Sequence, residues 1–235
     1  DAHKWRAAVR IVGGSASMPG APSLVAAAAL RAGAGMVGLS VPGATALDAA
    51  PVEAVLRPIP RVDWARDVLD SMERYHALVL GPGLGREDAT AAAARRVAIA
   101  AEVPVVIDGD GLFALAWNSE GAAALLRRRE GATVLTPHDG EYALLTGAPP
   151  GADRILAARR LAADTRAVVL LKGAATIVAE PAGAVLVVTT GDDRLATAGT
   201  GDVLTGIIAA LLACGLAPLH AAAAGAWVHG SAARL

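Results

Sequence analysis

The segment 196–202, Ala-Thr-Ala-Gly-Thr-Gly-Asp, places two glycines, a threonine and an aspartate directly before the apolar run 203–212. Glycines let the backbone approach a ligand closely, and the first N–H groups of a helix lack intrahelical partners, so such a segment favours a bound anion. Asp202 would lie beside that anion, where its carboxylate could take a proton from a substrate hydroxyl, as in phosphoryl transfer to an alcohol. The alternative is that Thr200 and Asp202 only cap a buried helix.

Five further loops that contain glycine, aspartate, histidine or lysine follow segments that predict β-strands. These loops are 13–15, 81–85, 108–111, 136–141 and 172–173. In an open α/β sheet, ligands bind at the carboxyl ends of the strands. We therefore predict that these loops share one rim of the sheet with the 199–202 turn, and that this rim is a ligand site.

Four polar side chains of these loops have both a structural and a functional interpretation. We expect His138 to contact a ligand rather than only to bond to the neighbouring backbone. Lys172, one of two lysines, is either a phosphate contact or a residue without a role. Asp110 is interpreted as the N-cap of a helix at 111–117, with metal or substrate contact as the alternative, and Glu141 as a first-turn residue whose charge suits a helix N-terminus.

Short β-branched runs alternate with alanine-rich helical stretches, which indicates a three-layer α/β/α domain with a mostly parallel central sheet. The expected strands are 9–12, 36–41, 77–80, 103–107, 133–136, 168–171, 176–179 and 185–189. The expected helices are 20–32, 87–101, 119–129, 139–145, 153–163, 202–214 and 219–234. The last three strands leave no room for helices between them, so we expect antiparallel edge strands joined by turns at 172–175 and 180–183. We expect one domain over 1–235.

Composition restricts the class of protein. With 54% hydrophobic and 18% charged residues, the 235-residue chain can build a substantial core. The net charge is -1, and no basic stripe exists that could follow a nucleic-acid backbone. Cys214 is the only cysteine, which excludes an intramolecular disulfide and indicates a reducing compartment. The apolar stretch 203–228 is interrupted by glycine, proline and histidine, so we expect a soluble, cytoplasmic protein. We expect His220 and His229 to have structural roles.

Four familiar motifs are absent or wrongly placed. The segment 33–38 matches G-x-G-x-x-G, but it leaves a helix and enters a strand, the reverse of a dinucleotide-binding turn. The segment 108–111 resembles the start of a calcium loop, yet Ser119 stands where the twelfth-position glutamate belongs. The sequence also contains no Walker lysine motif and no Cys/His cluster for zinc.

Six segments carry a more specific signal. They are 13–21 (Gly-Gly-Ser followed by Pro-Gly-Ala), 28–35, 81–85 (Gly-Pro-Gly-Leu-Gly), 135–141 (Leu-Thr-Pro-His-Asp-Gly-Glu), 171–176 (Leu-Lys-Gly-Ala-Ala-Thr) and 196–206. In this order they resemble the NAD(P)H-hydrate dehydratase family of the ribokinase-like superfamily, over nearly the whole chain. The resemblance implies a ribokinase-like fold and an enzyme that repairs a damaged cofactor.

The resemblance also implies the reaction and its participants. The substrate would be the S epimer of hydrated NADH or NADPH, whose ring hydroxyl is phosphorylated by ADP or ATP in the presence of Mg²⁺. Loss of phosphate would then restore the ring double bond. The family implies a homo-oligomer, up to a tetramer, that acts with a separate or fused epimerase, and we expect no epimerase domain within 1–235.

Site residues follow from the same resemblance. Asp202 would be the base that takes the proton of the substrate hydroxyl. The anion hole would consist of Gly199, Thr200 and Gly201. The hydrated dinucleotide would contact Ala21, Gly83, His138 and Asp202. The adenine nucleotide would be held by Lys172, Gly173, Ala174, Ala175, Thr176 and Gly201.

Two positions depart from the family pattern, and several alternatives stay open. Met18 stands where many members carry an aromatic residue, and Phe113 where many carry asparagine, so both reshape the substrate side of the site. The metal ligands, ADP against ATP, and NADH against NADPH are not decided by the sequence. A small-molecule kinase of the same superfamily and a non-catalytic nucleotide-binding module are the competing hypotheses.

Overall fold

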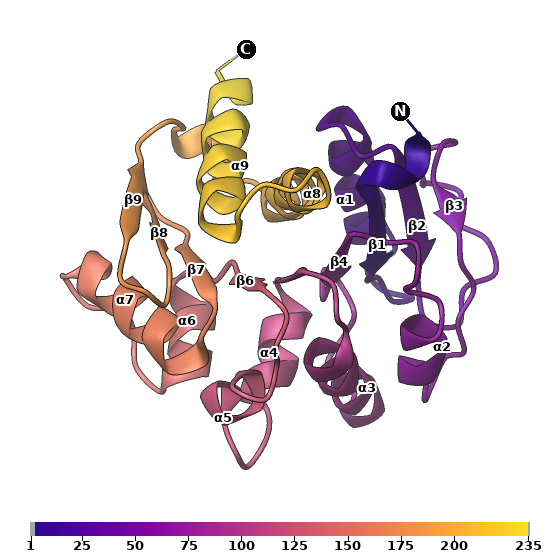
Figure 1. The fold of residues 1–235 in the computed structure, drawn as a ribbon, viewed down its shortest axis with the longest axis horizontal. Helices are drawn as coiled ribbons and strands as arrows, with labels where there is room; N and C mark the ends of the chain where they lie inside the picture. The colour runs from indigo at the N-terminus through magenta and orange to yellow at the C-terminus, as the bar shows by residue number, and fades with distance from the viewer. Residues whose placement is uncertain (1–2, 235) are drawn as a thin grey trace.

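The computed structural model describes residues 3–234, and within them nine β-strands form one sheet in the order β3-β2-β1-β4-β5-β6-β7-β8-β9 (Figure 1). The strands are β1 (Ala8–Val12), β2 (Met36–Ser40), β3 (Val55–Leu56), β4 (Ala77–Leu80), β5 (Val105–Ile107), β6 (Thr133–Leu135), β7 (Val168–Leu171), β8 (Thr176–Ala179) and β9 (Val185–Val188). Pairing is parallel from β3 through β7 and antiparallel at β8 and β9. The predicted parallel sheet with antiparallel edge strands is therefore confirmed.

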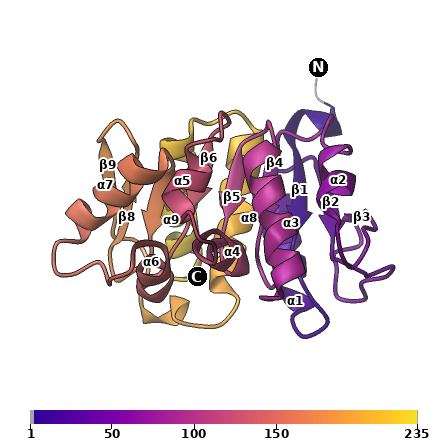
Figure 2. The same cartoon turned by 90° about the horizontal axis from the view of Figure 1, so that it is seen from below.

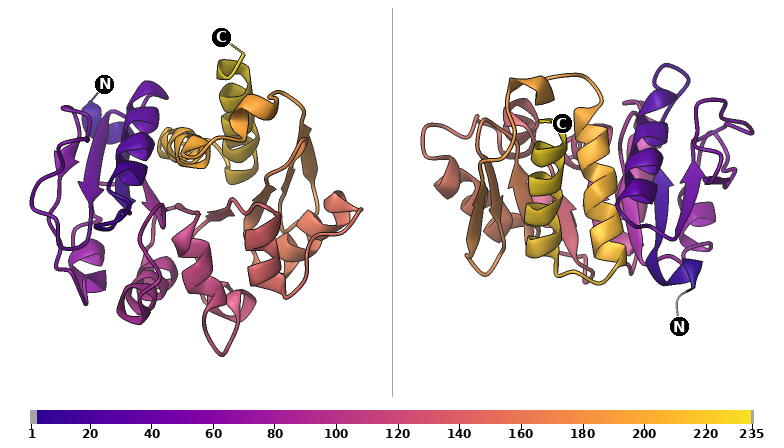
Figure 3. Two further views of the ribbon diagram at one scale, coloured as in Figure 1. Left: turned by 180° about the vertical axis from the view of Figure 1, so that it is seen from behind. Right: turned by 90° about the horizontal axis from the view of Figure 1, so that it is seen from above.

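Helices cover both faces of this sheet. They are α1 (Gly20–Arg31), α2 (Ala65–Leu69), α3 (Asp88–Ala100), α4 (Asp110–Ala116), α5 (Ala122–Leu126), α6 (Asp139–Thr146), α7 (Arg154–Thr165), α8 (Thr200–Ala213) and α9 (Pro218–Ala232), with short 3-10 turns at Lys4–Ala7 and Asp193–Leu195. One face carries α1, α8 and α9 (Figure 3), and the other carries α2 to α7 (Figure 2). None of the helices in the described part of the chain is long and apolar enough to span a membrane.

Strands covered on both faces must be apolar on both sides, and the sequence meets this demand. All residues of β1 and β4 are buried, and their apolar side chains alternate between two hydrophobic clusters, one beneath each helical layer. The exception is Arg10 of β1, whose guanidinium carbon lies 5.5 Å from the ring centroid of Tyr75. Because β1 to β7 are parallel, their carboxyl ends lie at one rim, where the glycine-rich loops follow. The predicted common rim is therefore present.

The α1–α8 contact fixes the position of the Gly199–Asp202 turn, because α8 begins there. A Cβ atom on Gly206 would lie 2.3 Å from the carbonyl oxygen of Val25 and 2.9 Å from Cβ of Ala28. The two helices therefore approach so closely that only glycine fits at this position of α8.

Gly206→Ala is expected to destabilise the protein by about 1–3 kcal/mol, because the added methyl group forces α8 away from α1. The matched control is Gly20→Ala, where an added Cβ meets nothing within 4 Å. Urea unfolding of the two variants measures the difference. Equal stabilities would show that the α1–α8 contact is not tight.

Some short elements differ from the sequence-based expectation. β3 and α2 are too short to produce a periodic pattern, and the sequence did not indicate them. The helix expected at 119–129 is shorter and forms only α5. It begins later because the Asn118 side chain accepts hydrogen bonds from the N–H groups of Glu120 and Gly121, which holds these residues in a turn.

Candidate active site

A cavity of about 900 Å³ opens at the carboxyl rim, between the β6–α6 loop, the β7–β8 hairpin, the segment 190–197 and helices α8 and α9. Seven residues singled out from the sequence line it, namely His138, Lys172, Gly173, Ala174, Thr176, Thr200 and Gly201. Three chain segments that lie far apart in the sequence therefore meet here. Ala175 belongs to the same hairpin but is not among the lining residues.

The N-terminus of α8 is one wall of this cavity. Gly199 has φ of +89°, and its N–H, like those of Gly201 and Asp202, has no hydrogen-bond partner within residues 3–234. The Thr200 N–H instead donates to the carbonyl of Thr197 at 3.3 Å, and its hydroxyl donates to the carbonyl of Leu195 at 2.7 Å. The amides available to an anion are therefore those of Gly199, Gly201 and Asp202, while Thr200 holds the preceding loop.

Asp108, at the end of β5, organises the polar contacts behind the cavity. Its carboxylate is buried, and Oδ1 accepts hydrogen bonds from the Thr136 hydroxyl at 2.7 Å and from Nζ of Lys172 at 3.0 Å. Oδ2 accepts a hydrogen bond from the Thr205 hydroxyl at 3.2 Å. A Cβ on Gly201 would lie 3.7 Å from Oδ2. Asp108 thereby ties β6, β7 and α8 together at the rim.

Lys172 supplies the positive charge of the site. Its Nζ also lies 3.6 Å from Oε2 of Glu141, so two carboxylates surround it. Burial alone would lower the pKa of Lys172, but the charges of Asp108 and Glu141 outweigh burial, and the pKa is raised. Lys172 is therefore a permanent cation beside the α8 N-terminus.

Asp202, in the first turn of α8, has the titration behaviour of a base that works near neutral pH. Burial raises its pKa to about 6, and the negative charge of Asp108 adds to this effect, while Lys172 opposes it. No hydrogen bond or ion pair from another described residue satisfies its carboxylate. A carboxylate with this pKa is mostly ionised at pH 7 and still basic enough to accept a proton efficiently.

The pH dependence of turnover follows from this pKa. If Asp202 is the base, only its ionised form is active, so kcat/KM should rise between pH 5 and 7 with an apparent pKa of about 6. His229 also titrates below its ordinary range, because burial and the charge of Lys172 lower its pKa. Profiles of Asp202→Asn and His229→Asn separate the two groups: the acid limb should disappear only in the first. A limb that persists in Asp202→Asn would contradict the assignment.

His138 combines the two interpretations considered for it. Its Nδ1 accepts hydrogen bonds from the N–H groups of Gly140 at 3.0 Å and Glu141 at 3.3 Å, which makes it the N-cap of α6. Glu141 completes a capping box by accepting the His138 N–H through Oε2 at 2.9 Å. The imidazole also lines the cavity. Because Nδ1 is an acceptor, the proton of a neutral ring is on Nε2, which lies 3.6 Å from Oε2 of Glu141.

Ala21 and Gly83, the two remaining residues implied for the substrate, lie next to each other. A Cβ on Gly83, whose φ is +66°, would be 3.0 Å from Cβ of Ala21 and 3.0 Å from Cβ of Met18. One turn further along α1, Leu24 packs against the α8 turn, since its Cδ1 would lie 2.7 Å from a Cβ on Gly199. This pair therefore flanks the α8 N-terminus on the side of α1.

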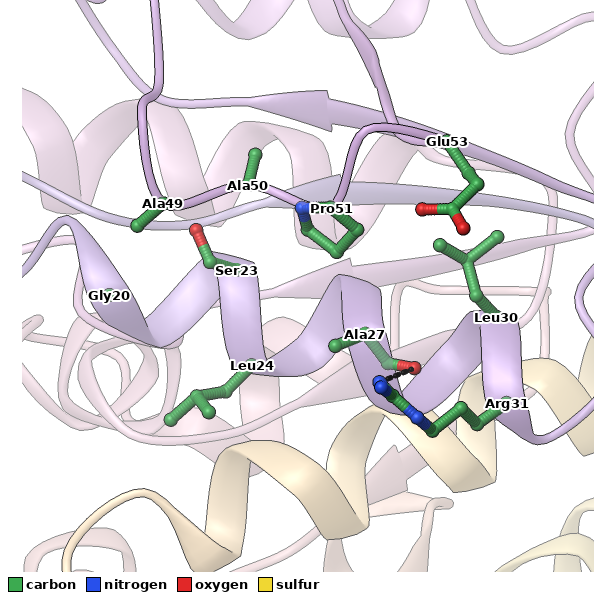
Figure 4. Close-up of a pocket in the computed structure, with 10 residues that line it drawn as sticks. All are labelled: Gly20, Ser23, Leu24, Ala27, Leu30, Arg31, Ala49, Ala50, Pro51 and Glu53. Carbon is green, nitrogen blue, oxygen red and sulfur yellow. Dashed lines mark hydrogen bonds between the residues drawn. The ribbon is translucent and has the colours of Figure 1, made fainter.

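A second hollow, of about 810 Å³, runs along α1 and is bounded by the loop 49–53 (Figure 4). Leu24 and Ala27 give it an apolar side, and Glu53 and Arg31 lie toward its far end in the picture. None of the predicted catalytic or ligand-binding residues lines it, so we assign no function to it.

Three features of the rim differ from or go beyond the sequence-based expectation. Asp108 belongs to the 108–111 loop that was predicted to lie on the rim, but the sequence did not indicate its contacts with Lys172 and Thr205. Asp110 is not an N-cap but the first residue of α4, and its carboxylate binds the 81–85 loop instead. His229, expected to be structural, lines the cavity together with the segment 190–197.

The described residues do not form a protein-built metal site. No group of three or more His, Cys, Asp or Glu side chains within residues 3–234 could hold a metal ion. Mg²⁺ commonly keeps several waters and binds through substrate phosphates with one or two carboxylates. We therefore assign no protein ligands to Mg²⁺.

The mostly parallel sheet covered by helices on both faces, with the unpaired amides of a helix N-terminus at its rim, is typical of a ribokinase-like protein. A ribokinase-like superfamily protein from Enterococcus faecalis superposes with a TM-score of 0.82 at 25% identity, over 98% of this chain and 80% of that chain. The model of the family described as NAD(P)H-hydrate dehydratase matches residues 9–235. The chain belongs to this family.

Individual relatives agree with this assignment. The ADP-dependent (S)-NAD(P)H-hydrate dehydratase of Neisseria meningitidis is 40% identical over 99% of this chain and 78% of its own length. The ADP/ATP-dependent NAD(P)H-hydrate dehydratase of Bacillus subtilis, co-crystallised with ATP/Mg²⁺, superposes with a TM-score of 0.80 at 32% identity, over 98% of this chain and 81% of that chain. The chain spans about half the length of the bifunctional NAD(P)H-hydrate repair enzymes that it also matches.

Proposed function

We propose that this chain uses ADP or ATP to dehydrate the S epimer of hydrated NADH or NADPH and so regenerates the intact cofactor. Membership of the family supports the reaction class. The observation that carries the chemistry is Asp202, a half-buried carboxylate with a pKa of about 6 beside unpaired helix N–H groups. A base and an anion site in contact are what phosphoryl transfer to a hydroxyl requires.

In the proposed reaction, the nucleotide occupies the cavity, and its terminal phosphoryl group lies against the amides of Gly199, Gly201 and Asp202. The carboxylate of Asp202 takes the proton of the ring hydroxyl as the hydroxyl oxygen forms a bond to the terminal phosphorus. The bond from that phosphorus to the bridging oxygen of the nucleotide breaks at the same time, so AMP leaves from ADP or ADP leaves from ATP. Lys172 balances the negative charge that gathers there. Hydroxide is a poor leaving group and phosphate a good one. The ring C–O bond then breaks with release of phosphate, and loss of a proton from the adjacent carbon restores the double bond.

The two ligands are proposed to meet at the α8 turn. The hairpin residues Lys172, Gly173, Ala174, Ala175 and Thr176, together with Gly201, are proposed to hold the nucleotide. The hydrated dinucleotide is proposed to contact Ala21, Gly83 and His138. Mg²⁺ bound to the phosphates would neutralise part of their charge.

The wider setting is also a proposal. We infer that the domain acts with an epimerase, which converts the other epimer of the hydrate into the one used here. The bifunctional names of several relatives support this inference.

Product analysis with hydrated NADH, a nucleotide and Mg²⁺ tests the function. The dehydratase releases inorganic phosphate and NADH in equal amounts. A small-molecule kinase would instead leave a stable phosphorylated product.

A further inference from the structure

Beside the rim, three side chains form a stack that the reaction described above does not use. The guanidinium carbon of Arg86 lies 4.7 Å from the ring centroid of Phe113. The rings of Phe113 and Trp117 are stacked, with centroids 5.5 Å apart and an angle of 15° between their planes. Phe113 and Trp117 are four residues apart and so lie on the same side of the α4 segment. Trp117 is 61% exposed, which leaves ring surface open to a further planar group.

The stack is fastened to the loop that carries Gly83. Asp110 is buried, and its Oδ1 accepts a hydrogen bond from Nε of Arg86 at 2.9 Å, while Oδ2 accepts one from the N–H of Gly85 at 2.8 Å. The same β5–α4 turn carries Asp108, the centre of the polar contacts behind the cavity. The stack is therefore continuous with the proposed substrate side of the site.

Both ends of the stack are held in place. Nη1 of Arg95 donates to the carbonyls of Ala114 and Trp117, at 3.0 Å each, which fixes the C-terminal end of α4. Arg86 pairs with Asp110 through Nε, and the two terminal nitrogens of Arg86, Nη1 and Nη2, have no partner within residues 3–234. Arg86 thus offers two donor nitrogens next to an exposed aromatic surface.

We propose that this stack is the subsite for the adenosine half of the hydrated dinucleotide: Trp117 stacks on the adenine ring, and Arg86 binds phosphate oxygens. This rests on the proposed function. Hydration gives the nicotinamide ring tetrahedral carbons, so adenine is the flat aromatic end of the substrate. Base stacking on aromatic side chains and arginine–phosphate contacts are the interactions that such a ligand uses. The cavity for the phosphoryl donor has no Phe, Tyr or Trp among its lining residues, so the stack is a separate place for a second adenine.

The test compares two substrates, hydrated NADH and hydrated reduced nicotinamide mononucleotide, which lacks the adenosine half. The wild-type enzyme should prefer hydrated NADH. Trp117→Ala should lower kcat/KM for hydrated NADH by roughly 5- to 100-fold, through an increase in KM. It should leave kcat/KM for the mononucleotide unchanged. Trp117→Phe should restore most of the preference.

Trp227→Ala is the matched control, since Trp227 is also exposed, at 56%, but lies on α9. Trp227→Ala should leave kcat/KM unchanged for both substrates. Equal kcat/KM of the wild-type enzyme for both substrates, or equal losses for both in Trp117→Ala, would overturn the subsite while the proposed function stands. Turnover of neither substrate by the wild-type enzyme would overturn the proposed function and the subsite with it.

Discussion

Asp202→Asn is expected to lower kcat by about 10²- to 10⁴-fold, the usual contribution of a positioned general base. Asparagine has the same shape and keeps the N–H at the start of α8, but its amide cannot accept a proton. Nucleotide binding should therefore stay close to that of the wild-type protein, because the backbone amides and Lys172 are unchanged. Steady-state kinetics with hydrated NADH and calorimetric titration with ADP or ATP measure the two effects separately.

Asp67→Asn is the control for this experiment, because Asp67 is an exposed carboxylate in the first turn of α2 and does not line the cavity. Its activity should equal that of the wild-type protein. If Asp202→Asn retained near-normal turnover, the proton would leave through another group, and the assignment of Asp202 would be wrong.

Lys172→Met is expected to reduce kcat by about 10²- to 10³-fold, as loss of a single transition-state donor commonly does. A second effect follows from the titration of Asp202. Lys172 lowers the pKa of Asp202, so removing the cation should move the acid limb of the pH profile to higher pH. A merely structural lysine would lower activity without this shift.

The other lysine of the chain, Lys4, provides the matched control for this change. It is exposed in the 3-10 turn before β1, so Lys4→Met should alter neither kcat nor the pH profile. Thermal unfolding shows whether Lys172→Met is folded, which we expect because Asp108 keeps its bonds to Thr136 and Thr205. An unshifted acid limb in a folded Lys172→Met protein would refute the electrostatic coupling.

The layers, the parallel order and the common rim could be predicted from the sequence because they depend on local patterns. Buried β-branched runs such as Val168–Leu171 and Thr176–Ala179 are bounded by turn residues, and the structure has these two strands at the predicted limits. The glycine-rich turn before α8 is recognisable in the same way, since a positive φ at Gly199 requires glycine.

The connections between side chains could not be predicted in this way. Asp108 meets Lys172 across 64 positions of the chain and Thr205 across 97, and no local pattern encodes such contacts. The hydrogen bond from the Thr200 N–H to the Thr197 carbonyl depends on how the 195–199 loop folds back. His229 lines the cavity because α9 packs beside α8. The hydrophobic pattern of the sequence does not indicate which helices pack together.

Asp202 and the α8 N-terminus are proposed to promote phosphorylation of a ring hydroxyl by the nucleotide, so that the oxygen can leave as phosphate. The most direct test incubates the purified protein with hydrated NADH, Mg²⁺ and either ADP or ATP, and follows the absorbance of reduced nicotinamide together with released phosphate. We expect recovery of NADH with at least one nucleotide, with one phosphate released per NADH and no recovery when the nucleotide is omitted. Absence of recovery with both nucleotides, or accumulation of a stable phosphorylated dinucleotide, would contradict it.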